Sequence, residues 1–145
     1  MFFDFPEDPA VGYLDRQYML GPDVLVAPVF SPDGVVDFYL PAGTWTSLLT
    51  GDRDEGGRWV RETHGASTLP VYVRPGAVIA RGTRDDRPDY DYLTELEFVA
   101  YPGGEANREV TVYGTDGNPT TFSVTVTADG ATASGPNGEV PARLE

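Results

Sequence analysis

Glycine- and proline-containing turns interrupt this sequence at short intervals from residue 31 onward, and they constrain the fold more than any other feature. Between the turns lie short β-prone runs at residues 35–40, 44–49, 58–61, 70–73 and 77–80. Glycine supplies the positive φ angles that tight turns need, and proline fixes φ. Short strands joined by such turns are typical of antiparallel sheets, so we expect a mainly β protein.

Alternating apolar and polar residues mark a second β module after about residue 90. The runs at 95–100, 109–113 and 121–127 place apolar side chains at every second position, as half-buried antiparallel strands do. Aspartate-glycine pairs at 116–117 and 129–130 favour hairpin turns between them. A polar segment at 81–91, with three Arg and four Asp, precedes the module and is expected to be a linker.

The first 30 residues carry a different pattern. Asp8 can cap a helix, and Val11, Leu14 and Tyr18 would share one of its faces, so a helix is predicted over residues 8–21. The run at 23–29 is almost continuously apolar, which is typical of a strand buried on both faces of a parallel sheet. Because the later modules are antiparallel, this portion looks like the end of a larger domain.

Length and composition exclude several classes of protein. The 145 residues are too few for a complete (β/α)8 barrel, which needs about 250. A net charge of −13 repels phosphate groups and anionic lipid, so neither nucleic acid nor a membrane is an expected partner. The absence of cysteine excludes disulfides and zinc–thiolate sites. Without a long apolar run or a basic leader segment, a soluble cytoplasmic protein is predicted.

Motifs for cofactors, metals and hydrolase triads are not found. No phosphate-binding loop, dinucleotide fingerprint or serine-hydrolase elbow occurs. His64, the single histidine, is interpreted as a loop residue rather than a metal ligand or catalytic base. Asp52, Asp54, Glu55 and Gly56 come nearest to a calcium loop but lack the spaced bidentate glutamate. Neither a cofactor nor a metal is expected.

Carboxylate pairs are the remaining candidates for chemistry in so acidic a chain. Acid–base catalysis by carboxyl groups needs two of them close together, with one kept protonated by its surroundings. Asp4, Glu7 and Asp8 cluster beside Phe5, whereas the aspartates at 81–91 are expected to be solvated. The structural alternative is that Asp8 caps the helix while Asp4 and Glu7 face water.

Trp45 and Trp59 allow two interpretations. Flat aromatic faces can pack against sugar rings, which would make either residue part of a carbohydrate site. Each tryptophan is centred in a short β run of a domain that has few large side chains, so core packing is the favoured prediction for both.

Several motifs together resemble glycoside hydrolase family 31, the α-glucosidases and α-xylosidases. They are FPEDP at residues 5–9, LDRQYMLG at 14–21, VLVAPVF at 24–30, FYLPAGTW at 38–45, TG at 50–51, GGRW at 56–59 and LPVYVR at 69–74. The first three resemble the end of the family's catalytic barrel, and the others resemble its proximal β-sandwich. RPDY at residues 87–90 resembles the start of the distal β domain of bacterial α-xylosidases.

The resemblance implies a fold in three parts: a remnant of the end of a (β/α)8 barrel followed by two antiparallel β-sandwich-like domains. Residues 1–30 would be the barrel end, with the end of strand 7, a helix and strand 8. Residues 31–84 would form the proximal domain and residues 85–145 the distal domain.

The resemblance also implies a retaining mechanism, in which one aspartate attacks the anomeric carbon and a second acts as acid and then base. Both would lie upstream on earlier barrel strands, so no catalytic residue is expected in this chain. Asp4, Phe5, Glu7 and Asp8 would follow the seventh strand and lie near the substrate, since barrel sites form at the carboxyl ends of strands.

The resulting hypothesis is the C-terminal accessory region of an α-xylosidase-like glycosidase, inactive alone, that hydrolyses terminal α-linked xylosyl or glucosyl residues. Its expected partners are the missing catalytic barrel, a carbohydrate substrate bound through that barrel, and a second copy of the chain in a homo-oligomer. The alternative is a stand-alone β-sandwich module that binds carbohydrate or drives oligomerisation.

Overall fold

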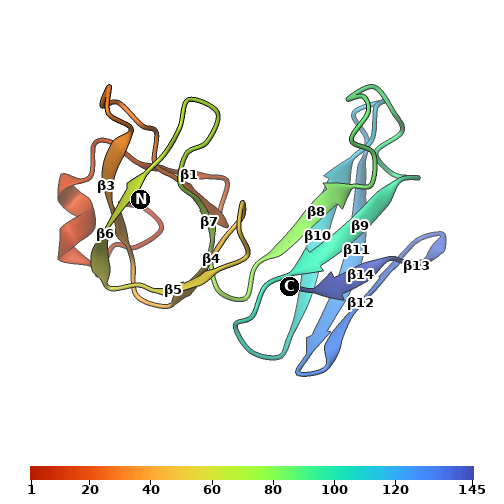
Figure 1. The fold of residues 1–145 in the computed structure, drawn as a ribbon. Helices are drawn as coiled ribbons and strands as arrows, with labels where there is room; N and C mark the ends of the chain where they lie inside the picture. The colour runs from red at the N-terminus through yellow and green to blue at the C-terminus, as the bar shows by residue number, and fades with distance from the viewer. The chain divides into compact units, whose positions relative to one another are not determined.

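The computed structural model describes all 145 residues, and the chain forms two compact units, unit 1 (Met1–Pro75) and unit 2 (Gly76–Glu145) (Figure 1). Unit 1 contains η1 (Pro9–Tyr13), β1 (Tyr18–Leu20), β2 (Val24–Val26), β3 (Val35–Leu40), β4 (Thr44–Ser47), β5 (Arg53–Glu55), β6 (Arg58–Thr63) and β7 (Val71–Val73). Unit 2 contains β8 (Val78–Gly82), β9 (Leu96–Ala100), β10 (Ala106–Tyr113), β11 (Pro119–Thr127), β12 (Gly130–Gly135), β13 (Gly138–Val140) and β14 (Ala142–Leu144). The mainly β fold predicted from the sequence is confirmed. None of its helical segments has the length and apolar character needed to span a bilayer.

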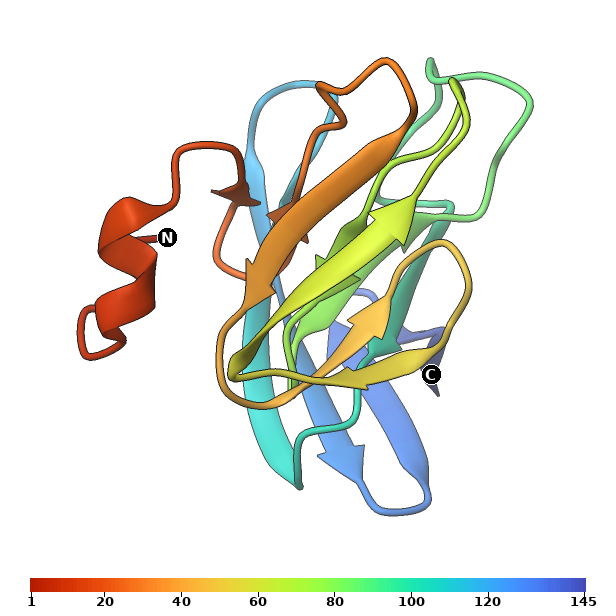
Figure 2. The same cartoon turned by 60° about the vertical axis from the view of Figure 1, so that its left-hand side comes forward.

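Unit 1 is built from a five-stranded sheet and a two-stranded sheet. Strand order in the larger sheet is β1-β2-β7-β4-β5, and all of its pairings are antiparallel. β3 and β6 form the second sheet and pair along six residues each. In Figure 2, η1 lies on the β3 side of this pair.

The core of unit 1 forms because the strands alternate inward and outward side chains. Phe38 and Leu40 on β3, Trp45 on β4, Leu25 on β2 and Tyr72 on β7 pack in one buried cluster. Trp45 is 1% exposed, and its indole Nε1 donates to the backbone oxygen of Pro41 at 2.8 Å. The turn-punctuated runs after residue 31 therefore form strands, as predicted.

The helix predicted over residues 8–21 is mostly wrong. Only the 3-10 helix η1 forms, and Leu14 already has extended backbone angles, φ −86° and ψ 107°. Tyr18 then lies in strand β1 rather than on a helical face. The apolar residues have helical spacing, but Gly12 would destabilise the interior of such a helix. The Gln17 side chain bonds to strand β3 instead.

Gln17 replaces a missing strand neighbour at the edge of β3. Its side-chain nitrogen donates to the Tyr39 carbonyl at 2.8 Å, and its side-chain oxygen accepts from the Tyr39 N–H at 2.7 Å. The Gln17 amide thus satisfies two backbone groups that would otherwise be unpaired at a buried edge.

Residues 25–27 of the apolar run at 23–29 are buried, as predicted, and the flanking residues of the run are half-buried. The predicted parallel pairing of this strand is wrong. β2 pairs antiparallel with both β1 and β7, so it belongs to the sheet of unit 1. Leu25 is fully buried because sheet neighbours lie on both sides and the two-stranded sheet contributes to the same core. A buried antiparallel strand carries the same continuous apolar signal as a parallel one.

Unit 2 also contains two sheets, with orders β10-β11-β12-β13 and β14-β9-β8. All of its pairings are antiparallel except that of β14 with β9, which is parallel. Phe98 and Phe122 lie 5.2 Å apart between ring centroids in a core that also holds Val124. This unit therefore has a hydrophobic core of its own.

The two units divide after Pro75, nine residues before the boundary expected after residue 84. β8 causes the difference, because Val78 and Ala80 face the core of unit 2 and the strand pairs with β9 along five residues. Most of the polar segment at 81–91 is thus a connection between two paired strands of unit 2.

Candidate functional site

Asp8, one of the acids expected near the substrate, has a structural role in this chain. Its Oδ1 accepts from the Ala10 backbone N–H at 3.0 Å, which caps η1, and its Oδ2 accepts from the Tyr39 hydroxyl at 2.9 Å. Burial first, and then the Asp8 carboxylate, raises the pKa of the Tyr39 hydroxyl. The capping role foreseen as the structural alternative for Asp8 is confirmed.

Phe5 packs into unit 1 rather than standing free. Its ring centroid lies 6.1 Å from that of Trp45, and the Arg74 guanidinium carbon lies 4.7 Å from the Phe5 ring centroid. Asp4 is half-buried and Glu7 is exposed. Of the four predicted residues, Phe5 and Asp8 therefore anchor the N-terminal segment to the strands, while Glu7 faces solvent.

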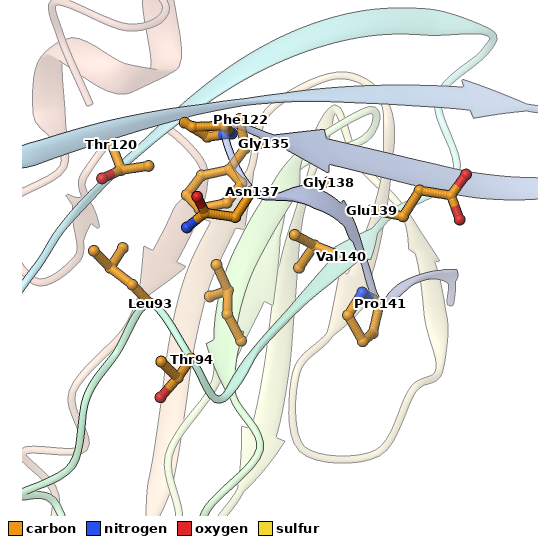
Figure 3. A pocket seen from close by; sticks show the side chains of 12 residues that line it. Leu93, Thr94, Thr120, Phe122, Gly135, Asn137, Gly138, Glu139, Val140 and Pro141 are labelled. Carbon is orange, nitrogen blue, oxygen red and sulfur yellow. The ribbon is translucent and has the colours of Figure 1, made fainter.

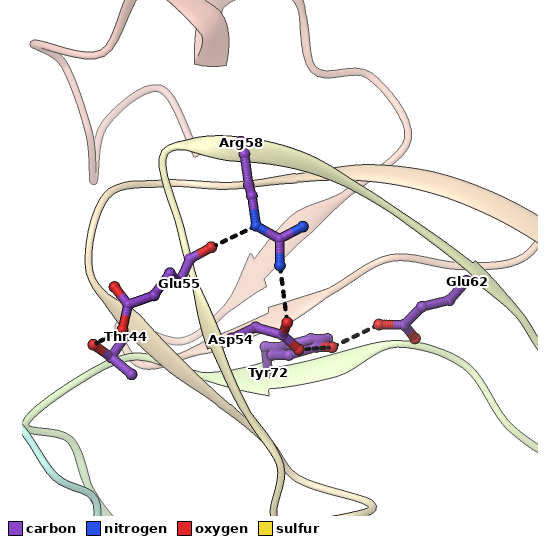
Figure 4. Close-up of polar contacts among 6 residues, drawn as sticks. All are labelled: Thr44, Asp54, Glu55, Arg58, Glu62 and Tyr72. Atoms are coloured by element: carbon purple, nitrogen blue, oxygen red, sulfur yellow. Dashed lines mark hydrogen bonds and ion pairs between the residues drawn. The ribbon is translucent and has the colours of Figure 1, made fainter.

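A polar network at Tyr72 joins both sheets of unit 1 (Figure 4). The Tyr72 hydroxyl lies 3.0 Å from Asp54 Oδ2 and 2.6 Å from Glu62 Oε1. Arg58 bonds Asp54 Oδ1 at 2.9 Å, and Glu62 Oε2 lies 2.6 Å from His64 Nε2. Because the hydroxyl has one proton, it cannot donate to both carboxylates at once. Burial, followed by the two carboxylates, raises the pKa of Tyr72 strongly.

His64 ends this network, since its Nδ1 lies 3.1 Å from the Thr68 hydroxyl. Both ring nitrogens therefore have protein partners, which agrees with the loop interpretation made for this residue. Sequence reasoning missed the network, because the strand register that turns its acids toward the core is known only from the structure. Glu62 pairs with Val36, and Asp54 pairs with Trp45, so both acids occupy positions that face the core.

Two of the three acids considered for a calcium loop are hydrogen-bonded to protein groups. Asp54 belongs to the Tyr72 network, and Glu55 Oε1 accepts from the Thr44 hydroxyl at 2.8 Å. The chain contains no group of three His, Asp or Glu side chains arranged to hold a metal ion.

The two tryptophans differ in burial. Trp45 lies in the core, as predicted, but the same prediction for Trp59 is wrong, because Trp59 is 57% exposed. Strand register explains the difference. Val60 points into the core, so its neighbour Trp59 lies on the opposite face of β6, next to Tyr39.

Unit 2 contains a cavity of about 400 Å³ (Figure 3). Its lining includes the apolar side chains of Leu93, Phe122 and Val140 and the polar residues Asn137 and Glu139. Glu139 is the one acid in the lining, so the cavity lacks a pair of carboxylates for acid–base chemistry.

The chain thus consists of two β units, and Asp8, Asp54 and Glu62 of the first unit are hydrogen-bonded to tyrosine hydroxyls. The family model described as "Glycosyl hydrolase family 31 C-terminal domain" matches residues 1–79. The chain belongs to glycoside hydrolase family 31, as its sequence motifs predicted.

Characterised relatives match over more than the first unit. An α-xylosidase from Emericella nidulans is 42% identical over 120 residues, which cover 77% of this chain and 15% of the relative. An α-glucosidase from Bacillus thermoamyloliquefaciens is 29% identical, over 96% of this chain and 16% of the relative. The structure of the family 31 α-xylosidase from Xanthomonas citri superposes with a TM-score of 0.76 and 25% identity, covering all of this chain and 16% of that protein. The chain thus spans about a sixth of the length of these relatives.

Proposed function

We propose that this chain is the C-terminal accessory region of a retaining α-glycosidase that hydrolyses terminal α-linked xylosyl or glucosyl residues. The observation that carries the proposal is the match of nearly the whole chain to proteins named α-xylosidase and α-glucosidase, at about a sixth of their length. The catalytic aspartates would belong to a barrel outside these residues.

The isolated chain is expected to be inactive. A retaining glycosidase needs two carboxyl groups about 5–5.5 Å apart on either side of a bound sugar. Asp8 and Asp54 are instead hydrogen-bonded to tyrosine hydroxyls. Their removal would therefore change stability before it changed any chemistry.

The missing barrel is the proposed partner of unit 1. Several large apolar side chains of unit 1 are exposed: Phe2, Phe3, Tyr13, Tyr18, Leu20 and Phe30. Exposed aromatic residues in such number are typical of a surface that another domain covers. We propose that those of the N-terminal segment pack on the barrel, and that Asp4, Phe5, Glu7 and Asp8 lie near its substrate.

The decisive experiment compares the chain with the longer protein encoded by its gene. Both are assayed with p-nitrophenyl α-xyloside and α-glucoside, and the anomeric form of the first product is read by NMR. We expect turnover with retention for the longer protein and none for the 145-residue chain. An in-frame stop codon directly upstream, or turnover by the chain alone that Asp4→Asn abolishes, would contradict the proposal.

The alternative is a module that binds carbohydrate or forms oligomers without a barrel. The specific observation in favour of sugar binding is the exposure of Trp59, which core packing does not explain.

A further inference from the structure

The face of the β3–β6 pair that points away from the Phe38 and Val60 core carries both charged and aromatic side chains. Strand register places three pairs on this face, which we call the outer strip: Val35 with Thr63, Asp37 with Arg61, and Tyr39 with Trp59. The residues between them, such as Phe38 and Val60, point into the core. The alternation of side chains along the two strands therefore determines which residues form the outer strip.

Trp59 packs against Tyr39 and is open to solvent. Its ring meets that of Tyr39 edge-on, with centroids 5.8 Å apart and planes at 61°. Tyr39 is itself fixed, because its hydroxyl bonds Asp8 and its backbone bonds the Gln17 amide. The exposed indole thus packs against one fixed neighbour, which limits its freedom and lowers the ordering cost of binding a ligand.

The next pair along the strip adds planar polar groups. Arg61 Nε bonds Asp37 Oδ1 at 2.7 Å and Arg61 Nη2 bonds Asp37 Oδ2 at 2.8 Å, while both side chains stay at least half exposed. Successive pairs on one face of a strand are separated by about 7 Å. The Asp37–Arg61 pair therefore lies about the length of one sugar residue from Trp59.

We propose that the outer strip binds a neutral oligosaccharide, with a pyranose ring packed on Trp59 and hydroxyl groups of the adjoining residue bonded to Asp37 and Arg61. The C–H groups of a sugar ring carry slight positive charge and are attracted to the face of an aromatic ring. Vicinal hydroxyls can donate to the free lone pairs of the carboxylate and accept from the outer N–H groups of the guanidinium.

Charge argues for this ligand over a protein surface or an acidic polymer. Covering the strip with a dry protein interface would desolvate the exposed Asp37–Arg61 pair, and removing two charges from water costs several kcal/mol per ion. The net charge of −13 repels acidic ligands. A neutral, hydroxyl-rich ligand keeps the pair hydrated in part and is not repelled.

Tryptophan fluorescence of the 145-residue chain tests the proposal directly, because Trp45 is buried and Trp59 is the accessible reporter. Maltotriose, isomaltotriose and cellotriose are titrated to about 20 mM, and we expect saturable binding of at least one with a Kd on the order of 1 mM. Isothermal titration calorimetry measures the variants that lack this reporter: Trp59→Ala should weaken binding at least tenfold, and Trp59→Phe should weaken it less. Arg61→Met retains the tryptophan signal and should also weaken binding.

The matched control is Tyr113→Ala, which removes an equally exposed aromatic side chain, 63% exposed, from unit 2. Binding should be unchanged in this variant, and circular dichroism verifies that each variant is folded. No saturable change with any of the three sugars, or undiminished binding by folded Trp59→Ala, overturns the proposal. The proposal is also overturned if a second copy of the chain, or the rest of the longer enzyme, covers Trp59. A longer protein without glycosidase activity would refute the proposed function alone, since sugar binding is measured on this chain.

Discussion

At the scale of single residues, unit 1 depends on polar side chains placed inside it. Gln17 and Tyr72 are both buried; the Gln17 amide bonds both backbone groups of Tyr39, and the Tyr72 hydroxyl lies within 3.0 Å of two carboxylates. Buried polar groups of this kind fix one arrangement of strands, because every competing arrangement leaves a donor or acceptor unpaired.

Gln17→Leu is expected to destabilise unit 1. The variant keeps the side-chain size but leaves the Tyr39 N–H and carbonyl without their partners, at a cost of about 1–3 kcal/mol for each buried group. Urea unfolding followed by circular dichroism measures the loss. Arg16→Leu, at the exposed neighbouring position, serves as the control, and equal stability of the two variants would contradict the role given to Gln17.

Tyr72 makes stability sensitive to alkaline pH. Its pKa is raised in the folded chain, whereas an unfolded phenol ionises near pH 10. The contribution of Tyr72 is therefore complete below about pH 10 and is lost as the pH rises further, because unfolding then releases a proton. The urea concentration at the unfolding midpoint should decrease as the pH rises above about 10, and it should decrease less steeply for Tyr72→Phe. A slope unchanged by the substitution would be the contrary result.

Sequence reasoning could not find these residues, for a physical reason. The Tyr72 network joins positions 54, 58, 62, 64 and 72, which come together only after three strands have paired. Local patterns identified Asp8 as a cap because capping needs only residues 8–10. Trp59 was misplaced because its β run was recognised but the phase of its alternation was not.

At the scale of secondary-structure elements, strands could be predicted where turn residues mark their ends. Gly34 and Gly117 have φ angles of 77° and 79°, which other residues adopt only with strain, and both lie at turns that the sequence marks clearly. The pairing of β1 with β2 was not predictable, since three-residue strands carry too few positions to separate a strand period from a helical one.

Gly135 on β12 makes a close contact between elements that a methyl group would disrupt. A Cβ atom there would lie 2.5 Å from Phe122 Cδ1. Gly135→Ala should therefore cost about 1–3 kcal/mol of unit 2 stability by overpacking. Gly130→Ala on the same strand meets nothing within 4 Å and is the control. If Phe122→Leu relieves part of the loss in the double variant, the ring contact is its source.

At the scale of the whole molecule, the chain contains two hydrophobic cores, each assembled within one unit. The family motifs lie mainly in unit 1, where the family model also matches. The shift in composition near residue 81 indicated a second β module. It did not indicate where that module begins, because β8 comes before the polar segment and its partner β9 comes after it.

A fragment of residues 76–145 is expected to fold without unit 1. It contains the complete core around Phe98 and Phe122. Its amide NMR spectrum should be well dispersed, whereas residues 76–141, which lack β14, should lose protection from exchange in β9. Collapsed amide shifts in the longer fragment would show that unit 2 depends on unit 1.

The parallel pairing of β14 with β9 also sets an order of events during synthesis. Residues 98–100 wait for residues 142–144, which leave the ribosome more than forty positions later, before their sheet is complete. Unit 1 has a pairing of similar sequence separation, because residues 24–26 pair with residues 71–73, but all of its strands are available once residue 75 has emerged. Folding from the N-terminal end would thus finish unit 1 first and leave β9 as a waiting edge, which nascent-chain proteolysis would detect as late protection of unit 2.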